Sequence, residues 1–158
     1  MSRPRARGFS FIELMASLAI MAVLLLVAVP SAKLAVQRHR EAELRTALAQ
    51  IRTAIDRYKK ATEQGRIPLE SGASGYPPDL AALVDGVEDA SSPERSMMYF
   101  LRRLPADPFY TGKADAEESW GLRSYASPPD DPSEGDDVFD VYSRAEGTGL
   151  NGVPYRDW

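Results

Sequence analysis

The 158-residue chain contains no cysteine and only one histidine, His39. Without cysteine, these residues can form no disulfide bond, no thiolate metal site and no cysteine nucleophile. His39 lies in VQRHRE, among charged residues on what we predict to be a solvated helix face, so a histidine-dependent triad or zinc site is not indicated. Basic patches with interleaved aromatic residues are also missing, and nucleic acid is therefore not an expected direct partner.

Charge is absent from one long stretch near the N-terminus. The 19 residues between Glu13 and Lys33 carry no charged side chain. As a helix this stretch would be about 29 Å long, close to the thickness of the hydrocarbon core of a bilayer. The sequence therefore predicts a terminal membrane segment followed by a water-soluble region.

The basic segment before the apolar run, MSRPRARG, allows a second interpretation. A conventional secretory signal would carry a small-residue cleavage site after its apolar core, and AVPSA (28–32) lies at about that place. The apolar run is longer than a typical signal core, however, and it leads without a break into a strong helical pattern. This continuity favours a retained anchor over a removed signal.

A helical pattern with one apolar face follows the charge-free run. Glu41 with Arg45 forms an acid-before-base pair at i, i+4, which supports a helix. The pattern predicts one helix from Phe9 to near Gln64, with Gly65 as its stop. Its apolar face consists of residues spaced 4, 3, 4 and 3 apart: Leu44, Leu48, Ile51, Ile55 and Tyr58.

The remainder of the chain is rich in loops and carries short elements. LAALV (80–84) predicts a short helix, and Ser92-Pro93 predicts the start of a second helix that ends near Pro105. RSYAS (123–127) and VFDVYS (138–143) have the composition of strands. We therefore expect an α+β fold, with the long helix packed on a small antiparallel sheet of two to four strands and a loop-rich C-terminal region.

The junction GFSFIE (8–13) places an acid inside the apolar segment. Glu13 is the fifth residue counted from Phe9, and a carboxylate in a membrane segment costs on the order of a few kcal/mol. If the chain were cut between Gly8 and Phe9, the new amine of Phe9 on a neighbouring subunit could pair with this carboxylate. Alternatively, Glu13 lies at the membrane interface near the leader arginines, and the physical argument leaves both interpretations open.

The sequence R-x-R-G-F-S-F-I-E-L-M, followed by an apolar run with a proline in its second half, resembles the signal of type IV prepilins and pseudopilins. The resemblance implies that a prepilin peptidase cuts after Gly8 and N-methylates Phe9. It also implies a docking role for Glu13 and a local loss of helical regularity at Pro30 in the filament. The implied organisation is a cleaved cytoplasmic leader (1–8), a transmembrane and filament-core segment (9–32) and a periplasmic domain (33–158).

The second half of the chain resembles the G-type major pseudopilin of type II secretion. The matching segments are YPPDLAALV, YFLRRLPADPF, WGLRSYASPPDD and DVFDVYSRAEGTGLNG, with Phe109 where a tryptophan is usual and about ten extra residues before Trp120. The resemblance implies a structural subunit of the inner membrane, not an enzyme, that polymerises with itself and with minor pseudopilins on an assembly platform. A subunit of a type IV pilus or DNA-uptake pilus is the alternative.

The G-type resemblance further implies a bound calcium ion in the C-terminal loop, where many adhesive type IV pilins have a disulfide. Calcium requires six to eight oxygen ligands. In place of the family's aspartate-rich D-x-D this sequence has LNGVPYRDW, so packing of Tyr155 and Trp158 is the alternative means of ordering the loop. The candidate oxygen donors are Asp140, Ser143, Glu146, Asn151 and Asp157.

Overall fold

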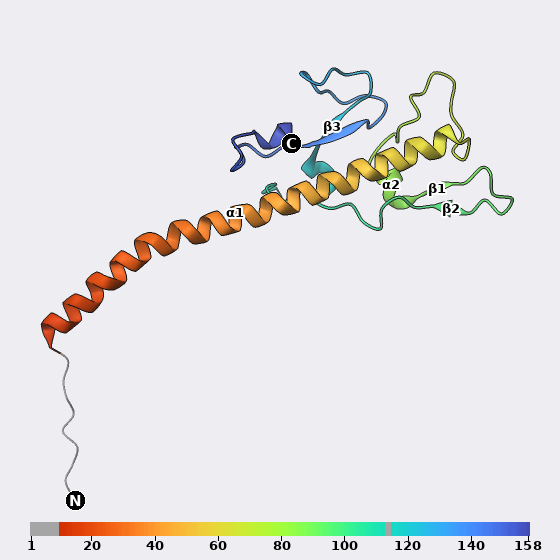
Figure 1. Cartoon of the computed structure of the whole chain (residues 1–158). Helices are drawn as coiled ribbons and strands as arrows, with labels where there is room; N and C mark the ends of the chain where they lie inside the picture. The colour runs from red at the N-terminus through yellow and green to blue at the C-terminus, as the bar shows by residue number, and fades with distance from the viewer. Residues whose placement is uncertain (1–9, 113–114) are drawn as a thin grey trace, which may run out of the picture. The chain divides into compact units, whose positions relative to one another are not determined.

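The computed structural model describes residues 10–112 and 115–158 of the chain (Figure 1). The chain forms two compact units, Met1–His39 and Arg40–Trp158, and the first helix contributes residues to both. The predicted α+β, pilin-like fold is confirmed, because a long N-terminal helix is followed by small antiparallel sheets. The elements in chain order are α1 (Phe11–Glu63), α2 (Ala81–Asp85), β1 (Val87–Glu88), β2 (Met97–Met98), η1 (Glu117–Ser119), β3 (Trp120–Arg123), β4 (Asp140–Ser143) and η2 (Tyr155–Asp157).

The C-terminal end of α1 lies where the sequence predicts it. Gly65 adopts the left-handed conformation, with φ of 71°. Its N–H donates to the carbonyl of Thr62 (2.9 Å), and the N–H of Arg66 donates to the carbonyl of Ala61 (3.0 Å). This pair of bonds is the Schellman motif, which satisfies carbonyls that would otherwise be unpaired at the helix end.

The hydrophobic core of the second unit forms along one face of α1. The five predicted residues of this face are all buried, and Leu44 and Ile51 are completely buried. Alanines at positions 47, 54 and 61 lie between them and allow close approach of the rest of the chain. The side chains that complete the core come from later segments: Leu80, Leu83, Trp120, Val138, Val141 and Tyr155.

Two separate two-stranded antiparallel sheets replace the single sheet of two to four strands that the sequence suggests. In one sheet β1 pairs with β2, and in the other β3 pairs with β4, with Trp120 opposite Ser143 and Arg123 opposite Asp140. The strand predicted at 123–127 is shifted, because β3 begins at Trp120. Burial of Trp120, whose indole N–H donates to the carbonyl of Pro105 (2.8 Å), favours the earlier pairing.

The helix predicted after Ser92 is wrong. Residues 92–95 form a turn, closed by a bond from the N–H of Arg95 to the carbonyl of Ser92 (3.0 Å), and the chain continues into β2. The N–H groups of Phe100 and Leu101 both donate to the carbonyl of Leu83 (3.0 and 2.8 Å). Local capping residues favoured a helix here, but these tertiary hydrogen bonds hold the segment extended.

An ion pair fastens the β1–β2 hairpin to the end of α1. The guanidinium of Arg66 donates to Oδ2 of Asp89 through Nε (2.9 Å) and through Nη2, and the hydroxyl of Ser91 donates to Oδ1 (2.5 Å). The hydrogen bonds from Arg66, and then those from Ser91, lower the pKa of Asp89 to about 2. Asp89 is therefore ionised at neutral pH and keeps the hairpin next to the C-terminal end of the helix.

Candidate functional site

The first part of α1 presents its apolar side chains on all sides. From Phe11 (77% exposed) to Val36 (55% exposed), the large apolar side chains described in this unit are exposed. One 18-residue window has a mean hydropathy of 2.6 and is 0% buried, so this helix is long and apolar enough to cross a membrane. An exposed apolar surface of this extent is typical of a segment that is covered by lipid or by other protein chains.

Glu13 lies in the first turn of this helix and is exposed. Its carboxylate is favourably placed against the partial positive charge at a helix N-terminus, an effect of about 0.3–1 kcal/mol in water. Gly8 and Phe9 lie outside the described residues. Cleavage and methylation there, and the pairing of Glu13 with the amine of a neighbouring Phe9, therefore stay predictions.

Pro30 lies inside α1, which is helical on both sides of it. Because proline has no N–H, the carbonyl four residues earlier, that of Leu26, has no α-helical donor from position 30. Membrane helices tolerate such positions when neighbouring chains or local adjustments satisfy the carbonyl. The loss of regularity predicted at Pro30 in a filament stays a prediction, since α1 is continuous here.

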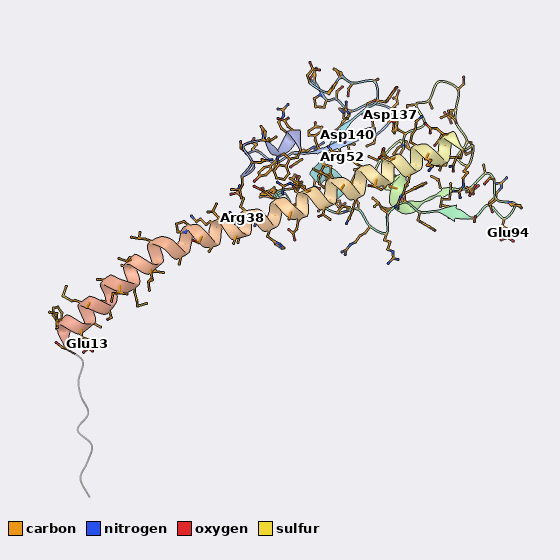
Figure 2. All side chains as sticks on the ribbon, viewed as in Figure 1. Glu13, Arg38, Arg52, Glu94, Asp137 and Asp140 are labelled. Carbon is orange, nitrogen blue, oxygen red and sulfur yellow. The ribbon has the colours of Figure 1, made fainter. Side chains whose placement is uncertain are left out.

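Among the candidate calcium ligands, Asp140 is bound by two arginines. Nε of Arg52 donates to Oδ1 of Asp140 at 2.7 Å (Figure 2), and Nη2 of Arg123 lies 3.6 Å from Oδ2. The N–H of Val141 also donates to Oδ1 (2.8 Å). The carboxylate is thus neutralised by two guanidinium groups and has little remaining capacity for a cation.

The other four candidates share no hydrogen-bond or ion-pair partner in the described part of the chain. The buried hydroxyl of Ser143 donates to Oδ2 of Asp107 at 2.5 Å, and Oδ1 of Asn151 accepts from the N–H of Val153 at 3.1 Å. Asp157 pairs with its neighbour Arg156 (3.5 Å), and Glu146 is exposed. Within the described ranges, no three His, Cys, Asp or Glu residues are grouped so that they could hold a metal ion. The donor set in this arrangement does not fit a calcium centre.

Glu41 has a role that the sequence interpretation missed. The i, i+4 pair with Arg45 exists, at 3.8 Å, but Glu41 is only 3% exposed. Its Oε1 accepts hydrogen bonds from the N–H of Leu150 (2.9 Å) and from the hydroxyl of Tyr155 (3.1 Å). The signal was its spacing: Glu41 lies three residues before Leu44, on the apolar face, where an acid needs partners from elsewhere in the chain.

Comparison with known proteins identifies the N-terminal region. Residues 3–29 match the family model described as the prokaryotic N-terminal methylation motif. No curated protein and no solved structure shows significant similarity to the chain. The matched motif indicates a prokaryotic prepilin of the type IV pilin-like kind, and such a motif implies processing by a prepilin peptidase and polymerisation in general. Together with the exposed apolar helix, it fits a single-pass, membrane-anchored pilin.

Proposed function

We propose that the chain is a structural pseudopilin, which polymerises into the periplasmic pseudopilus of a type II secretion system and so assists the export of folded proteins. The observation that carries the proposal is the position of the methylation motif. The motif spans residues 3–29, and most of the exposed apolar side chains of α1, from Phe11 to Val29, lie within it. A helix with this surface is stable in a bilayer before assembly and against neighbouring helices after it.

The N-terminal residues supply the assembly chemistry in this proposal. The prepilin peptidase cuts after Gly8 and methylates the amine of Phe9, which carries a positive charge. Glu13 of one subunit then pairs with that amine on its neighbour, and the pairing lowers the cost of a carboxylate in an apolar environment. Pro30 provides a position where the helix can adjust its hydrogen bonds as subunits pack.

The periplasmic location of the domain follows from the same proposal. The segment 9–32 spans the inner membrane once, with the leader in the cytoplasm and residues 33–158 in the periplasm. The partners are other copies of the chain, minor pseudopilins and the inner-membrane assembly platform. The absence of cysteine from the 158 residues supports a pseudopilin of the G type over a disulfide-closed adhesive pilin.

A structural role also agrees with the lining of a groove in the second unit. This groove has a volume of about 530 Å³, and its lining contains no carboxylate or histidine that could act as a general base for the hydroxyls of Thr46 and Thr53. Its lining residues are Arg45, Thr46, Ala49, Gln50, Thr53, Ala54, Arg57, Phe100 and Leu101.

Deletion of the gene in the bacterium that encodes it tests the proposal. We expect the exported proteins to accumulate in the periplasm, with surface pili and DNA uptake unchanged, and a plasmid copy to restore export. A copy with Gly8→Val is the matched control, since it supplies the same domain without a processed N-terminus. Normal export together with loss of pili or of transformation would instead assign the chain to a type IV pilus or a DNA-uptake pilus.

A further inference from the structure

The C-terminal segment 144–158 contains three glycines and little regular structure. Gly147 and Gly152 adopt positive φ angles of 136° and 80°. Glycine loses more backbone freedom on folding than any other residue, so contacts from outside the segment are needed to hold one conformation. These contacts come mainly from three side chains of α1.

Arg52 binds the last residue of the segment, Trp158, and the strand β4 that precedes the segment. Besides its bond to Asp140, its Nη2 donates to the carbonyl oxygen of Val141 (3.1 Å) in β4 and to that of Trp158 (2.8 Å). One guanidinium therefore joins α1 to β4 and to Trp158, which lie 88 to 106 residues from it in sequence. Hydrogen bonds from a charged donor are among the stronger ones in proteins.

Glu41 binds the middle of the segment. Its buried carboxylate accepts from the N–H of Leu150 and from the hydroxyl of Tyr155. The ring of Tyr155 in turn stacks on Phe109, with ring centroids 4.2 Å apart. A buried carboxylate without hydrogen-bond donors would strongly destabilise the fold. Leu150 and Tyr155 must therefore stay next to Glu41, and this requirement fixes the position of the segment.

Arg45 covers the last residue. Its guanidinium carbon lies 4.2 Å from the centre of the Trp158 ring, a cation–π contact. Residues 41, 45 and 52 are separated by 4 and 7 positions, so all three project from nearly the same side of α1. Arg45 and Arg52 contact Trp158, through its ring and its carbonyl oxygen, and Glu41 contacts the middle of the segment.

We propose that the C-terminal segment is fastened to α1 by Glu41, Arg45 and Arg52 without a metal ion, in place of the calcium that the G-type resemblance implies. A cation at Asp140 would have to displace Arg52 and would be repelled by Arg123. Displacement would also leave the carbonyl oxygen of Trp158 without its donor. The proposal concerns only the second unit and does not depend on which filament the chain builds.

Hydrogen exchange of the full-length chain in detergent micelles tests the proposal. Amide exchange in residues 147–158 is measured by mass spectrometry in millimolar EGTA and in millimolar calcium chloride. For the unmodified chain we expect the same exchange rates and the same melting temperature in both. Slower exchange of this segment in calcium, or a higher melting temperature, would overturn the proposal.

Substitutions test the role of the side chains. Arg52→Ala should speed exchange in 147–158 by about tenfold or more, the scale expected when charged hydrogen bonds are lost. Arg57→Ala is the matched control, because Arg57 is an exposed arginine of the same helix and, in the described part of the chain, makes no hydrogen bond or ion pair with the segment. Equal exchange in the two variants would contradict the proposal.

A milder variant covers the case in which Arg52→Ala does not fold. Arg52→Lys keeps the charge but cannot reach Asp140, Val141 and Trp158 together, because lysine lacks the planar fork of arginine. We expect intermediate exchange in 147–158 and no change in β1–β2. If Arg52→Lys exchanged at the same rate as the unmodified chain, the planar guanidinium of Arg52 would not contribute to holding the segment.

Discussion

Leu24 and Leu44 belong to the same helix, yet Leu24 is 63% exposed and Leu44 is completely buried. In the first unit the apolar side chains of α1 point in all directions, whereas in the second they form one face that Trp120 and Val141 cover. The residue types are similar, and the difference lies in which partners the chain itself provides. The exposed apolar surface of the first part of the helix is typical of a segment that is covered by a membrane or by other subunits.

The two glutamates within the apolar parts of α1 show the same contrast. Glu41 is buried and receives its hydrogen-bond donors from Leu150 and Tyr155 of the same chain. Glu13 is exposed in the first turn of the helix. If Glu13 acts in assembly, its partner comes from another copy. A carboxylate in apolar surroundings needs a partner, and in the second unit the chain itself supplies it.

The largest effect is expected from a block of processing, which would leave the first unit unable to assemble. The mature chain should begin at N-methylated Phe9 and contain 150 residues, from 158 minus the 8 of the leader. Its formal charge should change from −4 to −7, because three arginines leave. Gly8→Val should prevent cleavage, since a side chain next to the cleaved bond obstructs the peptidase, and filaments should be absent.

Mass spectrometry of membrane-extracted protein checks this prediction. Ser2→Val serves as the control, because it changes the leader at a distance from the cleaved bond, and its product should be identical to that of the unmodified chain. A mature protein that starts at Ser31 or Lys33 would show that the apolar run is a removed signal.

The second-largest effect is expected on filament assembly when Glu13 is replaced. Glu13→Ala should leave membrane insertion intact, because a costly charge is removed, and should reduce assembled filament several-fold or more, because the neighbouring amine loses its partner. Sheared filaments and membrane fractions are quantified by immunoblotting. Ser17→Ala, an exposed polar residue one turn further along, is the control. Filament at the unmodified level in Glu13→Ala would remove Glu13 from the assembly mechanism.

The same leucine-to-alanine substitution should change the free energy of unfolding in the second unit but not in the first. Leu44→Ala should lower the free energy of unfolding of the domain by about 2–5 kcal/mol, because it opens a cavity in the core. Leu24→Ala should leave it unchanged, because this side chain is 63% exposed. Urea titrations in detergent, followed by the fluorescence of the buried Trp120, measure both. A similar loss in the two variants would show that the first unit shares the core of the second.

The smallest effect should appear at acidic pH in the β1–β2 hairpin. The pKa of Asp89 is lowered from 3.8 to about 2, first by its hydrogen bonds from Arg66. The stabilisation is therefore complete above about pH 4 and is lost as pH falls toward 2. The melting temperature of Asp89→Asn should show a weaker decline over this window than that of the unmodified chain. Parallel curves for the two proteins would mean that other carboxylates control the acid response.

Much of the helical framework could be predicted from the sequence. The spacing of Leu44, Leu48 and Ile51 identified the buried face, and Gly65 identified the end of the helix, because periodicity and φ preference are local properties. The short helix at 81–85 was also predicted correctly from LAALV. The segment after Ser92 was not, since its capping residues suggest a helix, whereas the N–H groups of Phe100 and Leu101 donate to the carbonyl of Leu83.

The sequence alone therefore determined the apolar anchor, the acid at position 13, the methylation motif and the face of the helix that forms the core. Only the tertiary structure decided which residues order the C-terminal segment. Glu41 and Arg52 contact residues 88 to 114 positions away, and no local pattern specifies such distant partners. The physical reason is that a buried carboxylate or guanidinium is recognised by the groups that surround it, and these are brought together only by the folded chain.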